Sequence, residues 1–342
     1  MYFLTEDERR YLLRRILPEA RKIQVHPTLR GWHWAELDAP ARPTYDAPLG
    51  VYEVAEQYCE TGRDVYARRV LGHAPRPNRD MQEGAALHAF AAAWVTAAKR
   101  LLYCTAPALL MEALPRLLTD EALPVPADAA LAAKAEAIRQ FETYRLLAAV
   151  QDRLARQPDI GSDALAAAVL PVVVEQRLDG SFLGLSAHLS VDAMLIHGPI
   201  VMDLKFGPRQ EFHRLSTAGY ALALESAHET PVDIGCVIYV GFRGNTLVID
   251  RDFHFIDDEL RTRFIDERDR KQRLVEEEID PGLPARCYER CAYLRFCGAE
   301  AQRRAGPKWP AAASRRPVSA NRPPRDAGSP DVEYVPPEIP AS

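Results

Sequence analysis

The stretch IVMDLKFG, residues 200–207, places an aspartate and a lysine near the end of an apolar run. The apolar residues are of the types that favour a buried β-strand. Side chains two positions apart on a strand point to the same face of the sheet, so we expect Asp203 and Lys205 to lie side by side. Taken alone, this pair is better explained as a salt bridge at a strand end than as a functional site.

The elements predicted around this stretch are strands and helices separated by turn-prone residues. Strands are expected at residues 171–178, 182–197, 199–207, 233–242 and 246–255. Helical spacing appears at residues 211–228, and a charged helix is expected at residues 257–278. We therefore predict an α/β protein whose core, residues 81–280, has roughly 200 residues, a usual size for one domain.

Segments of different character flank or interrupt this core. Residues 1–80 are broken by prolines after an opening helix and are predicted to be irregular. Apolar spacing predicts helices at residues 81–118 and 127–156, and the part from 100 to 157 is interpreted as a helical insertion. Residues 305–342 hold nine of the chain's 27 prolines and show little apolar periodicity, so we predict a disordered tail.

The composition argues against some classes of protein. The first residues, MYFLTEDERRYLLRR, mix charged and apolar residues as an amphipathic helix does, unlike a signal peptide. No run approaches the roughly 18 apolar residues of a membrane span, so we expect a cytoplasmic protein with no membrane partner. The formal net charge of -5 does not favour a nucleic-acid-binding protein. Arginines do cluster in residues 63–79 and 286–295, and such patches either bind phosphate or simply face solvent.

Other residues on neighbouring elements can complete a metal site around Asp203. Asp192 lies in the preceding strand, Glu175 in the strand before it, and His88 on the helix that precedes both. Carboxylate oxygens are the ligands that Mg²⁺ or Mn²⁺ prefers, and a bound ion activates water and neutralises charge on a phosphoryl oxygen. The lysine can stabilise the same charge. Tyr220, in the following helix, could reach this site.

The six cysteines point to metal or redox ligands rather than to disulfides, because the chain is expected in the cytoplasm. Three of them lie within residues 281–304 with the spacing C-x₃-C-x₅-C, namely Cys287, Cys291 and Cys297. Cys59 is the leading candidate for a fourth ligand, because it lies in an arginine-rich segment outside the strands. Cys104 and Cys236 lie in apolar stretches, where cysteine usually acts as a small hydrophobic residue. Four such ligands suit zinc and iron–sulphur clusters alike.

The order of these residues resembles that of the PD-(D/E)XK nuclease superfamily, specifically its RecB-like branch. The shared order is a helix with histidine, strands with glutamate, aspartate and Asp-x-Lys, and a helix with tyrosine. The resemblance implies a restriction-endonuclease-like core with a mixed sheet flanked by helices, in which the metal ligands are His88, Asp192 and Asp203. It implies a catalytic site made of Lys205, Asp203, Asp192, Glu175 and Tyr220. The branch often has a Q-x-x-x-Y motif, but Ser216 stands here where the glutamine is expected.

Four stretches carry a narrower resemblance: LRGWHWAE (29–36), YCETGRDVYARRVLG (58–72), HRLSTAGYALALES (213–226) and PVDIGCVIYV (231–240). Together they resemble the CRISPR-associated RecB-like exonucleases of the Cas-four family, in the Csa-one variant found with subtype I-A systems. The resemblance ends near residue 304. It implies a DNA exonuclease that acts on single-stranded ends, 5′ to 3′. Such an enzyme trims prespacers and assists PAM selection during spacer acquisition, in antiviral defence.

The same resemblance implies partners and a second cofactor. The partners are DNA, the Cas-one/Cas-two integrase and a second Cas-four-type protein. A [4Fe–4S] cluster held by four cysteines would staple the N- and C-terminal segments together, and zinc is the alternative. The four are Cys59, Cys287, Cys291 and Cys297. Two other functions fit the same residues, namely a RecB-like nuclease of DNA repair or end resection, and a non-catalytic iron–sulphur scaffold subunit of the adaptation complex.

Overall fold

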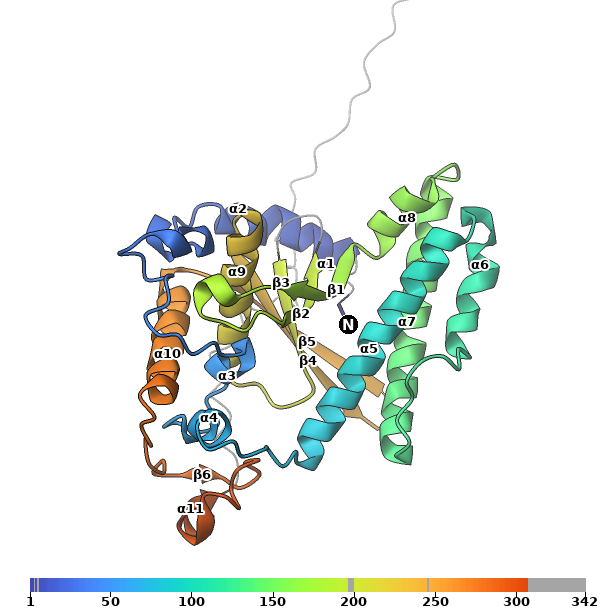
Figure 1. Cartoon of the computed structure of the whole chain (residues 1–342). Coiled ribbons are helices and arrows are strands. Elements are labelled where there is room, and N and C mark those ends of the chain that lie inside the picture. The colour runs from blue at the N-terminus through green and yellow to red at the C-terminus, as the bar shows by residue number, and fades with distance from the viewer. Residues whose placement is uncertain (3, 5, 196–199, 245, 307–342) are drawn as a thin grey trace, which may run out of the picture.

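The computed structural model describes residues 1–306 except residues 3, 5, 196–199 and 245. Within this part of the chain, five strands form one mixed sheet in the order β1-β2-β3-β4-β5, with helices on both faces (Figure 1). Only the β3–β4 pair is parallel; the other three pairs are antiparallel. The predicted α/β class, with a mixed sheet flanked by helices, is confirmed. The strands are β1 (Val172–Leu178), β2 (Leu189–Leu195), β3 (Ile200–Lys205), β4 (Ile234–Arg243) and β5 (Thr246–Phe255).

The strand predicted at residues 182–197 is wrong in its first half. β2 begins only at Leu189, because Ser181–Leu183 form a 3₁₀ turn instead. Gly184 ends that turn with φ of 66°, a left-handed conformation that glycine adopts without steric cost. The end of the predicted strand, at residues 196–197, lies outside the described residues.

Helix α9 (His213–His228) connects the two parallel strands, β3 and β4, as a parallel pair requires. Its apolar residues Leu215, Ala218 and Leu222 share one buried cluster with Val201 of β3. Helix α10 (Asp258–Glu276) lies on the same side of the molecule and adds Phe264 to this cluster (Figure 1). One face of the sheet is therefore covered by α9 and α10.

Three helices cover the other face of the sheet: α5 (Arg79–Cys104), α7 (Ala129–Arg156) and α8 (Ser162–Val169). The helix predicted at residues 81–118 is too long. Thr105 is extended and ends α5, and Pro107 and Pro115 each lie in the first turn of a 3₁₀ helix, with the short α6 (Leu110–Ala113) between these two turns. Apolar spacing continues past these prolines, but a continuous helix does not.

Short helices and turns make up most of residues 1–80, which fits their predicted irregularity. The helices are α1 (Glu6–Tyr11), a π-helix (Leu12–Ile16), α2 (Leu17–Ala20), α3 (Val51–Ala55) and α4 (Arg63–Arg69). Two 3₁₀ turns, Pro27–Leu29 and Gly31–Ala35, lie between α2 and α3.

The charged helix α10 ties the first segment to the core. Arg261, Arg268 and Lys271 are all fully buried. The Lys271 ammonium donates hydrogen bonds to the carbonyl oxygens of Glu53, Val54 and Glu56 at 2.8–3.0 Å, which satisfies carbonyls at the end of α3. The Arg268 guanidinium binds carbonyl oxygens of residues 40–42 in the same way. Long-range hydrogen bonds from α10 therefore hold residues 40–56, which have little regular structure, against the core.

The C-terminal part of the described chain is a small cysteine-bearing unit. Strand β6 (Cys287–Tyr288) pairs in parallel with β7 (Ala305–Gly306), and α11 (Gly298–Arg304) joins them. Ala305 and Gly306, which lie at the start of the predicted disordered tail, form β7 instead, and residues 307–342 lie outside the described residues. None of the described helices is long and apolar enough to cross a membrane.

Candidate active site

The candidate site forms where the ladder between β2 and β3 stops. The last paired residues are Ala193 and Met202. Beyond them, the Leu204 N–H donates to Oδ2 of Asp192 at 2.8 Å, so a side chain takes the place of the next strand partner. On the neighbouring strand, Glu175 adopts φ of 51°, which is unusual for a residue with a side chain. Irregular backbone of this kind often accompanies functional sites.

Three of the predicted residues meet at this point. His88, Glu175 and Asp192 each offer one donor atom, and these three atoms lie within 4.8 Å of one another. His88 Nε2 donates to the Leu204 carbonyl at 2.6 Å and lies 3.7 Å from Oδ2 of Asp192. Glu175 is exposed and accepts a hydrogen bond from the Ser190 hydroxyl at 2.8 Å. The group combines two carboxylates and an imidazole, which suits a divalent cation such as Mn²⁺.

Asp203 and Lys205 lie side by side on β3, as their spacing predicts. Lys205 Nζ donates to Oδ1 of Asp203 at 3.2 Å and lies 3.1 Å from Oδ2. Burial raises the pKa of Asp203 to about 6, although the Lys205 ammonium opposes this rise. Burial alone would lower the pKa of Lys205, but the carboxylates of Asp203 and Asp192 raise it above its ordinary value. The lysine is therefore held charged beside two acids.

One buried oxygen of Asp203 could bind a metal ion. Oδ2 of Asp203 is buried and accepts no hydrogen bond from the described residues. Asp203 is not one of the three residues within 4.8 Å, although its charge interacts with Asp192 and His88. Oδ2 forms an ion pair with the Lys205 ammonium at 3.1 Å, and a divalent cation would supply the further ligand contact that a buried carboxylate oxygen can accept. The residues present therefore fit a metal ion.

Tyr220 lies on the side of α9 that faces these acids. Burial raises the pKa of its hydroxyl, and Asp192 and Asp203 raise it further. Ser216, one turn earlier on α9, is buried. The structure thus places Tyr220 near the acidic residues. At position 216, the buried serine offers a hydroxyl in place of the amide of the expected glutamine.

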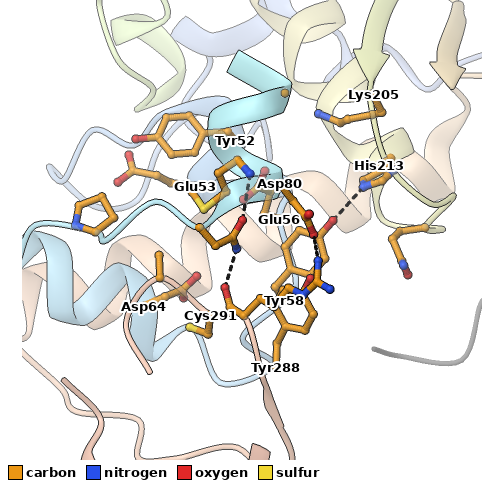
Figure 2. A pocket seen from close by; sticks show the side chains of 18 of the residues that line it. Tyr52, Glu53, Glu56, Tyr58, Asp64, Asp80, Lys205, His213, Tyr288 and Cys291 are labelled. Carbon is orange, nitrogen blue, oxygen red and sulfur yellow. Dashed lines mark hydrogen bonds and ion pairs between the residues drawn. The ribbon is translucent and has the colours of Figure 1, made fainter. Parts of the chain in front are cut away.

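A cavity of about 530 Å³ opens beside the site. His88 and Lys205 line one end and Cys291 the other, as Figure 2 shows for the last two. Tyr58 and Tyr288 line it between these ends, with stacked rings 5.5 Å apart. A single cavity therefore connects the charged end of β3 with the cysteine-bearing unit.

Sequence analysis missed three residues near Lys205. Burial raises the pKa of Glu56, although Lys205 opposes the shift. Burial lowers the pKa of His213 to about 3, with a further contribution from Lys205, and its Nε2 lies 3.4 Å from the Tyr58 hydroxyl. Tyr58 and His213 lie in two of the stretches that carry the family resemblance, residues 58–72 and 213–226, whereas Glu56 lies just outside them.

The four predicted cluster cysteines come together from distant segments. Burial raises the pKa of Cys291 to about 12, and the thiols of Cys59 and Cys297 contribute to the rise. Burial also raises the pKa of Cys287, and Cys59 raises it further. Cys104 is exposed at the end of α5, and Cys236 is buried within β4. All six cysteines lie in the described part of the chain and are free of disulfides.

The fold and the site together define an α/β protein in which acids and a lysine of the mixed sheet meet a histidine of α5, and this histidine and lysine line a cavity. The family described as "CRISPR-associated exonuclease Csa1" matches residues 1–301, and this chain belongs to that family. A relative of that description from Saccharolobus solfataricus is 32% identical over 303 residues, which cover 86% of this chain and 99% of the relative. Another from Thermoproteus tenax is 31% identical over 286 residues, covering 84% and 96%.

Proposed function

We propose that this protein is a metal-dependent DNA exonuclease of CRISPR adaptation, with a PD-(D/E)XK core. The observation that carries the proposal is the group formed by His88, Glu175 and Asp192, with the Asp203–Lys205 pair beside it. The relatives are named CRISPR-associated exonucleases, which supports the same class of reaction.

Each residue has a role in phosphodiester hydrolysis. His88, Asp192 and Asp203 would hold Mg²⁺ or Mn²⁺, and Glu175 would assist through a water molecule. A bound divalent ion lowers the pKa of water and neutralises phosphoryl charge. Lys205 stays protonated and stabilises the negative charge that develops on the phosphate oxygens. Tyr220 keeps its hydroxyl proton and can donate to the substrate.

The substrate we propose is a single-stranded DNA end, digested 5′ to 3′. Tyr58 and Tyr288 can stack on bases, and Arg68 and Arg290 also line the cavity and can bind phosphate. A local groove of this kind can bind DNA despite the acidic net charge. In adaptation, the enzyme would trim prespacers and assist PAM selection beside the Cas-one/Cas-two integrase, together with a second Cas-four-type protein in the cytoplasm.

We propose a [4Fe–4S] cluster at Cys59, Cys287, Cys291 and Cys297. Within the described residues, no three of these sulphurs lie within 4.8 Å of one another. Zinc at the same four cysteines is the alternative. Either group would act as a structural staple, because hydrolysis transfers no electrons. A brown protein with stoichiometric iron is expected, and a colourless protein with stoichiometric zinc would exclude the cluster.

The decisive experiment is degradation of single-stranded DNA in the presence of Mn²⁺. Wild type should release the label from a 5′-labelled linear strand and spare a circular strand, whereas Asp203→Ala should leave both strands intact. Asp159→Ala is the matched control, because Asp159 is exposed and lies outside the site. A wild type that binds DNA and integrase but cleaves nothing would instead support the scaffold function. Cleavage without any effect on prespacer integration would favour the repair nuclease.

A further inference from the structure

The side chain of Tyr2 is buried beneath the candidate site. Its exposed fraction is only 2%, and its ring belongs to the apolar cluster that contains Met202 and Leu204 of β3. Despite this burial, the Tyr2 hydroxyl has no hydrogen-bond partner among the described residues. A buried hydroxyl without a partner is costly, so phenylalanine would fill the same space at lower cost. The hydroxyl therefore needs an explanation beyond packing.

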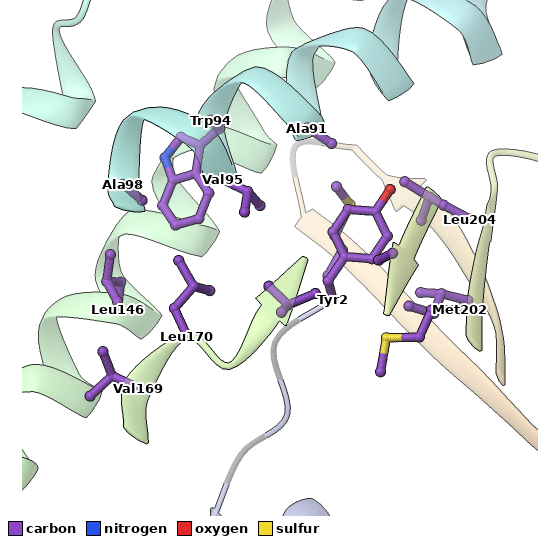
Figure 3. Packing of buried hydrophobic residues seen from close by; sticks show 14 of the residues in the cluster. Tyr2, Ala91, Trp94, Val95, Ala98, Leu146, Val169, Leu170, Met202 and Leu204 are labelled. Carbon is purple, nitrogen blue, oxygen red and sulfur yellow. The ribbon is translucent and has the colours of Figure 1, made fainter. Parts of the chain in front are cut away.

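The direction of this hydroxyl points to the site. Figure 3 shows it pointing toward Ala91 on α5 and toward Leu204 at the end of β3. Ala91 lies one helical turn after His88. The backbone of Leu204 binds both side chains: its carbonyl accepts from His88 and its N–H donates to Asp192. The hydroxyl is thus directed at the backbone on which two candidate metal ligands are fixed.

The charges around the hydroxyl are those of the same site. Burial raises the pKa of Tyr2 well above its ordinary value, and the carboxylates of Asp192, Glu175 and Asp203 raise it further. A phenol that keeps its proton is a hydrogen-bond donor, and the carboxylates are acceptors. The Tyr2 hydroxyl is therefore a hydrogen-bond donor near a group of acceptors.

We propose that Tyr2 is a positioning residue, whose hydroxyl donates a hydrogen bond to a water molecule that bridges it to the carboxylates of Asp192 and Glu175. The inference rests on the proposed function, because it assumes that Asp192 binds a divalent ion and that Glu175 assists through a water molecule. A donor behind a ligating carboxylate fixes its orientation, and the loss of such a donor typically weakens metal binding or activity 10- to 100-fold. The second residue of the sequence would thus be part of the site.

Direct binding of Mn²⁺ tests this role without relying on cleavage. Tyr2→Phe removes only the hydroxyl, and Tyr144→Phe on α7 is the matched control because Tyr144 is largely exposed. Isothermal titration with MnCl₂ alone should show Mn²⁺ affinity at least about tenfold weaker for Tyr2→Phe, and unchanged for Tyr144→Phe. The melting temperature of Tyr2→Phe should stay close to that of wild type, since the hydroxyl has no direct partner among the described protein groups.

The outcomes separate this inference from the proposed function. Equal Mn²⁺ affinity for Tyr2→Phe and wild type would overturn the positioning role, even if wild type cleaves DNA. Weaker affinity for Tyr2→Phe would support that role, even if wild type cleaves nothing and the nuclease proposal fails. A wild type that binds no Mn²⁺ would overturn the metal site and this inference together.

Discussion

The Nε2 atom of His88 lies 3.7 Å from Oδ2 of Asp192, and both atoms are hydrogen-bonded to the backbone of Leu204. One residue belongs to a helix and the other to a strand that follows it much later in the chain. Their separation is therefore set by the packing of α5 against the end of β3, and not by a mobile loop. Sites carried by rigid elements hold their geometry more closely than sites on loops.

Replacement of Lys205 by alanine should reduce the rate of DNA cleavage at least about 100-fold, because the positive charge facing the phosphate is lost. Folding should change little, since burial already raises the pKa of Asp203 to about 6 and the carboxyl can take up a proton when its partner is absent. Initial rates with Mn²⁺ and circular dichroism measure the two effects. Lys22→Ala is the surface control. Equal rates for Lys205→Ala and wild type would remove Lys205 from the site.

Replacement of Cys291 by alanine should remove both the colour and several kcal/mol of stability, because a group bound by distant cysteines holds the folded chain together. Absorbance near 400 nm and iron content report the first effect, and thermal unfolding reports the second. Cys104→Ala, at an exposed position outside the four proposed cluster ligands, should keep both the colour and the stability. A Cys291→Ala protein that melts like wild type would contradict the role as a staple.

Lys271→Met should lower the free energy of unfolding by roughly 3 kcal/mol, since it leaves three carbonyl oxygens near the end of α3 without their donor. Urea unfolding measures the change. Lys22→Met, at an exposed position, should cost no more than about 0.5 kcal/mol. If both variants unfold at the same urea concentration, α10 does not hold the first segment through this lysine.

The buried His254 should make stability fall in mild acid. Burial lowers the pKa of this imidazole from 6.5 to about 4, so below pH 6.5 the unfolded chain binds a proton that the folded chain does not. The stabilisation is complete above the unfolded pKa and is lost as the pH falls toward 4, by about 2 kcal/mol at pH 5. Urea unfolding at pH 7.5 and 5 should show a smaller fall for His254→Gln. The same fall in both proteins would assign the acid sensitivity to other groups.

Local patterns in the sequence were sufficient for the sheet and for one pair of site residues. Alternation and apolar runs placed all five strands of the sheet within the described chain, and spacing by two placed Asp203 beside Lys205. These local patterns failed where the apolar periodicity continues but the helix or strand does not. The helix predicted to residue 118 ends at Cys104, and the strand predicted from residue 182 begins at Leu189.

The sequence by itself determined the α/β class, the order of elements and the charged pair on β3, because these depend on neighbours two to four residues apart. Only the tertiary structure decided which distant polar atoms meet. It brings His88 and Glu175 to Asp192, buries Lys271 of the charged helix α10, and leaves the Tyr2 hydroxyl without a hydrogen-bond partner among the described residues. Periodicity reports which face of an element is apolar, but a buried polar group finds its partners through long-range packing.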